Sequence, residues 1–223
     1  MLMANTNIDE LSKSLETLYL DGKFDKAVDL LLESKNQLTA VDFHYNLGTV
    51  YSKMGELGPG RYHLELAMKK GYIGSDILNN LAFIKSKLQG IDLSFSQNMS
   101  DKLLSFLSQY PVSYAVSITL VLMLISLLLF KFKKVGSKLV LGALLVLSLS
   151  PVISHQLLLS GKSFAVNIKE MKIYEGPSSV YDVRVTIPGG SKFILGKSDG
   201  DWFYIDHPLD LTGWVKKEDI GIL

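Results

Sequence analysis

The chain has 223 residues, enough for one or two domains, and its 48% hydrophobic and 20% charged residues are typical of folded protein. A net charge of +1 gives no support for nucleic-acid binding, and the absence of cysteine excludes disulfides, cysteine-ligated metal sites and a cysteine nucleophile. The mean hydropathy of +0.24 is high for a soluble protein and raises the question of where the apolar residues lie.

The charges divide the chain into three parts. Residues 1–111 and 163–223 each carry a net charge of −2, whereas residues 112–162 carry five lysines and no acidic side chain. Inside that middle part, residues 112–130 and 139–159 are almost continuously apolar. At about 1.5 Å per residue, a helix of that length crosses a hydrocarbon core of about 30 Å. We therefore expect two transmembrane helices, because nothing else in the chain is large enough to bury them as core helices.

The loop between these helices predicts their orientation. Residues 131–138 (KFKKVGSK) contain four lysines, and lysine-rich short loops stay in the cytoplasm. Both termini would then lie in a bacterial periplasm or its equivalent; the alternative, with both termini cytoplasmic, goes against the charge rule. Pro151 is expected to kink the second helix, and His155 to lie near its interfacial end.

Export of the first segment requires a signal peptide, and the first residues do not form a complete one. Met1–Asn5 lacks a charged region and an apolar run of about 7–15 residues. It resembles the last part of such a run followed by a small residue. We therefore expect the natural start to lie upstream and to encode a basic, apolar leader.

Residues 8–89 show a helical repeat. Gly22 and Gly55 occupy equivalent positions 33 residues apart, and each is expected to end the first helix of a pair in the left-handed conformation. The run Asn46-Leu47-Gly48-x-x-Tyr51-x-x-x-Gly55 resembles the tetratricopeptide repeat, although Leu57-Gly58-Pro59-Gly60 departs from that pattern. Close approach of paired helices is expected at Ala27, Gly48, Ala67 and Ala82. We predict about two and a half repeats, or roughly five helices; a generic helical bundle is the alternative.

The tetratricopeptide resemblance implies a peptide-binding scaffold whose inner face is formed by the first helix of each pair. So few repeats give a short groove, suited to one helix or one chain tail. The candidate binding residues on this face are Tyr45, Asn46, Thr49, Asn79, Asn80 and Phe83. The alternative for each is a solvated position or a contact with the next repeat. Residues 90–111 are expected to form a linker or a last helix.

After Gly161 the pattern changes from helical to alternating. Turn-forming residues separate short runs rich in β-branched and aromatic side chains, at 164–166, 171–174, 183–187, 192–195, 202–205 and 213–215. Five or six short strands in about 60 residues predict a small barrel, since closure hides the sheet edges.

The order of these features resembles a bacterial SH3 domain over residues 163–223. The matching residues are Ile173–Ser178, Gly190, Asp201–Ile205, Gly213–Val215 and Ile220. The resemblance implies an extracytoplasmic domain that binds peptides or cell-wall material. The candidate ligand surface consists of Trp202, Tyr204 and Trp214, and the alternative for Trp202 is a place in the core of the barrel.

No catalytic or metal-binding pattern is present in the sequence. The four histidines, His44, His63, His155 and His207, lack paired ligand spacing, and His44 and His63 are expected to cover helix surfaces. Nucleotide-binding and serine-hydrolase motifs are missing as well. We expect a protein that is not an enzyme and has no cofactor and no metal site.

Together these segments predict a multidomain membrane protein: an all-α helical repeat, a two-helix transmembrane hairpin and an all-β SH3-like barrel. This order is similar to the BatE family of the Bacteroides aerotolerance operon. The resemblance implies partners in the membrane, namely Bat proteins with von Willebrand factor A domains, and indirectly a MoxR-type ATPase. It suggests a membrane-anchored scaffold for a periplasmic complex; the second hypothesis is a cell-wall sensor or anchor that holds peptidoglycan through the barrel.

Overall fold

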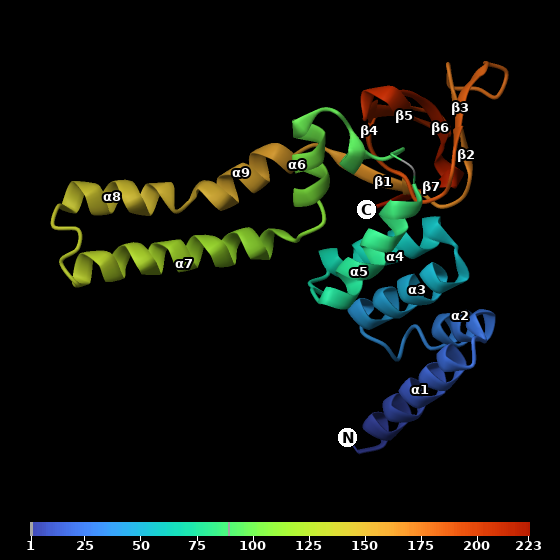
Figure 1. Ribbon diagram of the computed structural model, residues 1–223, viewed down its shortest axis with the longest axis horizontal. Coiled ribbons are helices and arrows are strands. Elements are labelled where there is room, and N and C mark those ends of the chain that lie inside the picture. Colours follow the sequence, from blue (N-terminus) through green and yellow to red (C-terminus); the bar gives the residue numbers. More distant parts are fainter. Residues whose placement is uncertain (1, 89) are drawn as a thin grey trace.

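The computed structural model describes residues 2–88 and 90–223, with side chains from Ile8 onward (Figure 1). The first helices are α1 (Leu2–Leu20), α2 (Phe24–Glu33), α3 (Ala40–Met54), α4 (Leu57–Lys69) and α5 (Ser75–Lys87). A short 3-10 turn, η1 (Leu93–Phe95), and helix α6 (Met99–Leu107) lead to α7 (Val112–Lys131), α8 (Lys138–Leu147) and α9 (Ser150–Leu159). Met1 and Gln89, which belong to the predicted chain start and to the end of the predicted repeat, lie outside the described residues.

The strands that follow are β1 (Ser163–Asn167), β2 (Met171–Tyr174), β3 (Val183–Ile187), β4 (Lys192–Asp199), β5 (Trp202–His207), β6 (Gly213–Lys216) and β7 (Ile220–Ile222). They pair antiparallel in the order β3-β2-β6-β5-β4-β1-β7. Each predicted run is a strand, and the short β7 contains Ile220. The chain therefore combines helices with one antiparallel sheet.

Local signals set the ends of the first helices. Gly22 and Gly55 follow α1 and α3 with φ of +70° and +82°, the left-handed conformation predicted for both. Thr39 caps α3 by accepting a hydrogen bond from the backbone N–H of Asp42 at 3.1 Å. The apolar stripes of α2 and α3 then pack together through Ala27, Leu31, Phe43, Leu47 and Val50.

Small residues bring α3 and α4 close together. A Cβ at Gly48 would lie 2.7 Å from Leu64 Cγ, so glycine is required there. Ala27 and Ala67 are fully buried, as expected, but the prediction for Ala82 is wrong because this side chain is exposed. Helix α5 packs through Ile77, Leu81 and Ile84, and Ala82 lies off that face.

Among the described residues, two helical segments are long and apolar enough to cross a membrane: Val112–Lys131 and Lys138–Leu159. Only 17% and 6% of the residues in their most apolar windows are buried, whereas a core helix of a soluble protein would be mostly buried. The second segment is interrupted between α8 and α9. Pro151 stands in the first turn of α9, where its missing N–H costs no helical hydrogen bond, and the interruption precedes it.

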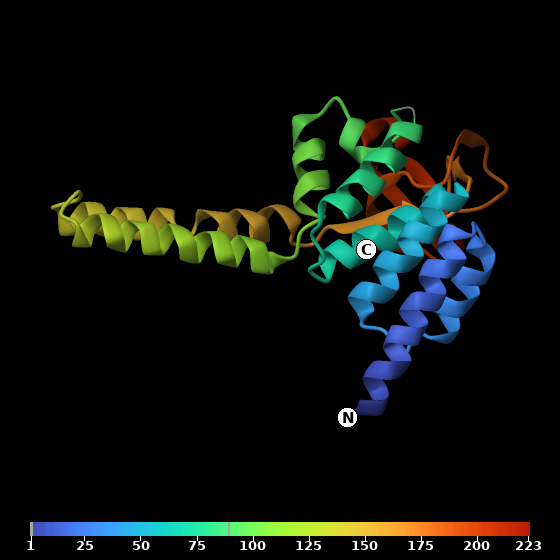
Figure 2. The same cartoon turned by 60° about the horizontal axis from the view of Figure 1, so that its bottom comes forward.

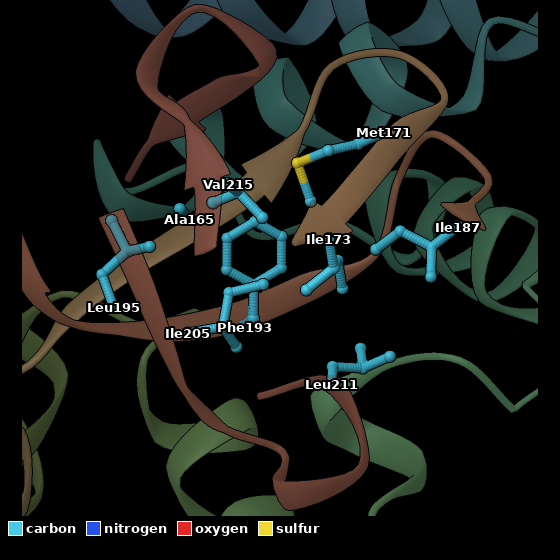
Figure 3. Packing of buried hydrophobic residues seen from close by; sticks show 9 residues of the cluster. All are labelled: Ala165, Met171, Ile173, Ile187, Phe193, Leu195, Ile205, Leu211 and Val215. Carbon is cyan, nitrogen blue, oxygen red and sulfur yellow. The ribbon is translucent and has the colours of Figure 1, made fainter. Parts of the chain in front are cut away.

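The sheet encloses an apolar core (Figure 3). Alternate residues of its strands point inward together with Leu211 from the 3-10 turn η2 (Leu209–Leu211). The core residues are Ala165, Met171, Ile173, Ile187, Phe193, Leu195, Ile205, Leu211 and Val215. Ile91, which precedes η1, packs against this core, so the sheet is joined to the helical part of the chain.

Helix α4 docks directly on the sheet. A Cβ at Gly58 would overlap the carbonyl group of Ile168, which follows β1, and a Cβ at Gly190 would lie 3.1 Å from the carbonyl oxygen of Leu57. The Leu57-Gly58-Pro59-Gly60 run, which departs from the repeat pattern, thus lies where the backbones of helix and sheet touch. Because the glycines have no side chains, the backbones of the helix and the sheet can approach this closely.

Four charged side chains are fully buried in this interface. Arg61 of α4 donates to Glu65 Oε1 at 2.9 Å, to Asp92 Oδ1 at 2.6 Å and to the carbonyl oxygen of Gly190 at 2.7 Å. Lys192 of β4 donates through Nζ to Glu65 Oε2 and through its backbone N–H to Asp92 Oδ1 at 2.7 Å. Two positive and two negative charges therefore compensate one another without water contact, as buried ions require.

The ionisation of the acids follows from this arrangement. Burial by itself would raise the pKa of Glu65, but Lys192 and Arg61 lower it below the usual value. Burial would also raise the pKa of Asp92, and Arg61 lowers it. Burial lowers the pKa of Lys192 to about 8, against the opposing effect of Glu65.

Removal of one charge from this network should destabilise both parts of the chain. Asp92→Asn leaves Arg61 without its bidentate partner, so we expect unfolding free energy to fall by about 3–5 kcal/mol. The measurement is denaturant unfolding of the full chain in detergent. The matched control is Asp21→Asn, which breaks the exposed ion pair with Lys23 and should cost less than about 1 kcal/mol. Equal losses in the two variants would contradict the importance of the network.

Candidate binding surfaces

A groove runs between α1 and α3, with a volume of about 580 Å³. Its walls combine apolar side chains, such as Leu15, Tyr19 and Leu38, with polar ones. Three of the predicted binding residues, Tyr45, Asn46 and Thr49, line it. A concave surface of mixed character is typical of a ligand site.

Tyr45 is held firmly at the edge of this groove. Its hydroxyl donates to Asp76 Oδ2, and its ring stacks on Tyr72 with 4.4 Å between centroids. Tyr72 donates to the same carboxylate oxygen at 2.7 Å. Burial and the Asp76 hydrogen bond raise the pKa of Tyr45, so the phenol stays protonated. Tyr45 thus gives the groove a rigid wall.

The other three predicted residues lie on α5. Asn80 donates to Thr49 Oγ1 at 3.3 Å and links α5 to α3. Asn79 and Phe83 are exposed, and Lys87 Nζ lies 5.4 Å from the Phe83 ring centroid. The groove-lining residues of α1 were missed in the sequence, because the two helices meet only after the intervening α2 has turned the chain back.

An aromatic and basic surface covers the outer face of β2, β6 and β5. Tyr204 and Trp214 are cross-strand partners with ring centroids 5.4 Å apart, and Trp202 contacts Tyr174 at 5.2 Å. Lys197 Nζ lies 5.5 Å from the Tyr204 ring centroid and 5.3 Å from that of Trp214. The three residues predicted for this surface therefore share one face of the sheet.

The alternative that places Trp202 in the core is wrong, because this side chain is partly exposed. It lines a depression of about 450 Å³ together with Asp201, Lys216, Lys217 and others. Trp214 is buried, with 9% exposure, so little of this predicted ligand residue is open to a partner. Successive side chains of β5 point alternately into the core and toward the outer face, and Ile205 points into the core.

His44 and His63 form a pair that the sequence spacing did not predict. Their Nδ1 atoms lie 2.8 Å apart and their ring centroids 5.1 Å apart in a stack, so the two histidines, which were expected to cover helix surfaces, pair with each other between two helices and are half-buried. They lie on the antiparallel neighbours α3 and α4, where residues 19 positions apart come into contact. Burial, His44 and Lys35 lower the pKa of His63 to about 4.

Within residues 2–88 and 90–223, no group of three or more His, Cys, Asp or Glu side chains is arranged to hold a metal ion. The Arg61–Lys192 network is fully enclosed and satisfies its own charges, which leaves no free group for a ligand. The groove and the aromatic surface are therefore the candidate sites.

The chain matches no protein-family model, no curated protein and no solved structure. Its class is given by its own architecture: helices joined to an antiparallel sheet, with two helical segments long and apolar enough to cross a membrane.

The histidine pair should make the helical part sensitive to acid. Since the pKa of His63 is about 4 in the folded chain and 6.5 in a free side chain, the unfolded state takes up the proton first. The unfolding free energy is therefore highest above pH 6.5. It decreases as the pH falls, by about 2 kcal/mol between pH 7 and pH 5. The test is urea unfolding across this range, above the usual carboxyl pKa. His63→Phe should flatten most of the decline, and an unchanged decline would refute the assignment.

Proposed function

We propose that the chain is a non-enzymatic, membrane-anchored scaffold that assembles a protein complex through the groove between α1 and α3. In this proposal the helices α1–α5 act as tetratricopeptide-like repeats and the sheet as a bacterial SH3-like domain. The single observation that carries it is the groove itself, a concave surface with a rigid wall at Tyr45. Its size suits one helix or chain tail.

The anchor consists of α7 and the α8–α9 segment, joined by a lysine-containing loop. The buried Glu65–Lys192 ion pair between α4 and β4 and the Arg61–Gly190 hydrogen bond support placing the segments before and after the anchor on one side of the membrane. Two crossings satisfy this requirement. The lysines at 131, 133, 134 and 138 favour a cytoplasmic loop, and thus two periplasmic termini in a bacterial inner membrane.

The proposed partners follow from the location and from the resemblance to the BatE family. They are membrane proteins with von Willebrand factor A domains of the Bat type, with a MoxR-type ATPase acting indirectly across the membrane. The system would serve stress or oxygen tolerance.

The groove is tested by a substitution that fills it. Asn46→Arg should weaken binding to a purified von Willebrand factor A partner by more than about tenfold, because a bulky charge would occupy the groove. Asp29→Arg on the exposed side of α2 is the matched control and should leave the affinity unchanged. The affinity is measured by titration of full-length chains in nanodiscs. Equal affinities of the two variants, or no binding by the unmodified chain, would contradict the proposed role.

The aromatic and basic surface supports a second candidate, a cell-wall sensor or anchor. Ring faces can stack on sugar rings, and Lys197 and Lys216 suit the carboxylates of peptidoglycan or acidic peptides. In this case the helical groove would be secondary.

Retention on purified peptidoglycan separates the two candidates. If the sheet is a cell-wall anchor, the full chain in detergent should be retained, and Trp202→Ala should reduce retention roughly tenfold. Leu209→Ala, at an exposed site outside the lining of that depression, is the control. Absence of retention by the unmodified chain would eliminate this candidate and leave the scaffold untouched.

A further inference from the structure

Helix α6 is covered by protein on one side, where Asp101, Leu104 and Ser105 are buried, and carries exposed apolar side chains on the other. Leu104 packs in a cluster with Leu93 of η1, Phe164 of β1 and Ile194 of β4. On the opposite side of the helix, Met99, Leu103 and Phe106 are 74%, 47% and 56% exposed. These three residues lie at positions i, i+4 and i+7, so they form one apolar stripe that faces away from the sheet.

The stripe lies where the anchor leaves the rest of the molecule. Both views show α6 at the root of the hairpin, running across the hairpin's long axis, with the sheet on one side and the hairpin extending from the other (Figures 1 and 2). Helix α6 packs against α9, and four residues connect Leu107 to Val112 at the start of α7. The face turned away from the sheet is therefore turned toward the region that the hairpin enters.

Aromatic rings continue the stripe into the anchor. The Phe106 and Tyr110 ring centroids are 5.2 Å apart, and those of Tyr110 and Tyr114 are 6.1 Å apart. Tyr114 lies in the first turn of α7 and is exposed. Tyrosines at this position are typical of the level of lipid headgroups.

Basic side chains lie at the same level. A hollow of about 260 Å³ is lined by Lys69 and Lys162 together with Tyr110, His155 and other residues. Lys102, exposed beside the apolar stripe, adds a third positive charge. Long lysine side chains can reach phosphates while neighbouring apolar groups enter the acyl region, so these charges suit anionic lipid headgroups.

We propose that α6 is an interfacial helix: the stripe of Met99, Leu103 and Phe106 inserts into the surface of the same bilayer that the hairpin crosses. This inference rests on the proposed membrane anchor. The continuity of the stripe with the exposed surface of α7 identifies lipid as the occupant. Helix α6 then lies in the membrane plane, with its apolar face about 5–10 Å into the headgroup–acyl boundary, and holds the sheet and the helices α1–α5 against the membrane.

The natural lack of cysteine makes a direct depth measurement possible. Leu103→Cys and Phe106→Cys are labelled singly with an environment-sensitive fluorophore, and the full chain is reconstituted in vesicles of phosphatidylcholine and phosphatidylglycerol. Quenching by lipids that carry a nitroxide near the headgroup or deep in the acyl chain gives the depth. Leu120→Cys in the middle of α7 reports on the anchor, and Asp29→Cys on exposed α2 is the matched control.

We expect the labels at 103 and 106 to be quenched by the shallow nitroxide, the label at 120 by the deep one and the label at 29 by neither. Labels at 103 and 106 that behave like the one at 29, while 120 is quenched, would overturn the inference and leave the anchor intact. If the labels at 103 and 106 become shielded only at high protein density, and neither lipid quencher reaches them, the stripe is covered by a second copy of the chain. That result would also overturn the inference. Absence of quenching at 120 would contradict both the proposed membrane anchor and the inference that rests on it.

Discussion

The four buried charges of Arg61, Glu65, Asp92 and Lys192 connect parts of the chain that the hairpin separates in sequence. A buried charge costs free energy unless an opposite charge lies beside it. A displacement of α4 relative to β4 would separate these charges and is therefore unfavourable. The segments before and after the hairpin are therefore packed together as one unit. The hairpin is an insertion into that unit, and its two ends emerge from the same side of it (Figure 2).

Features with short-range causes could be predicted from the sequence. The positive φ of Gly22 and Gly55, the apolar length of α7 and the alternation of the strands depend on neighbouring residues, and all three agree with the structure. The face shared by Trp202, Tyr204 and Trp214 also follows from a period of two along β5 and from strand pairing.

Features that depend on distant contacts were not predictable in the same way. Glu65 and Lys192 are 127 positions apart, and as single charged residues they look like surface groups in the sequence. His44 and His63 meet only because α3 and α4 pack antiparallel. The sequence did hold one signal: Gly58 breaks the repeat pattern, and a missing side chain there marks the place where the sheet's backbone touches the helix.

The network of buried charges also makes the two walls of the candidate groove differ in rigidity. Helix α3, one of its walls, packs on α4, which the charged network fixes to the sheet. The other wall, α1, packs on α2 at the end of the row of helices that lies away from the sheet (Figure 1). Local opening costs least free energy where few apolar residues are buried, and among the described side chains of α1 only Leu11 is buried, so α1 is the wall that can adjust to a ligand. A partner bound in the groove would contact one adaptable helix, α1, and one fixed helix, α3. Because α3 packs on α4, and α4 is fixed to the sheet, the partner would also be positioned relative to the anchor.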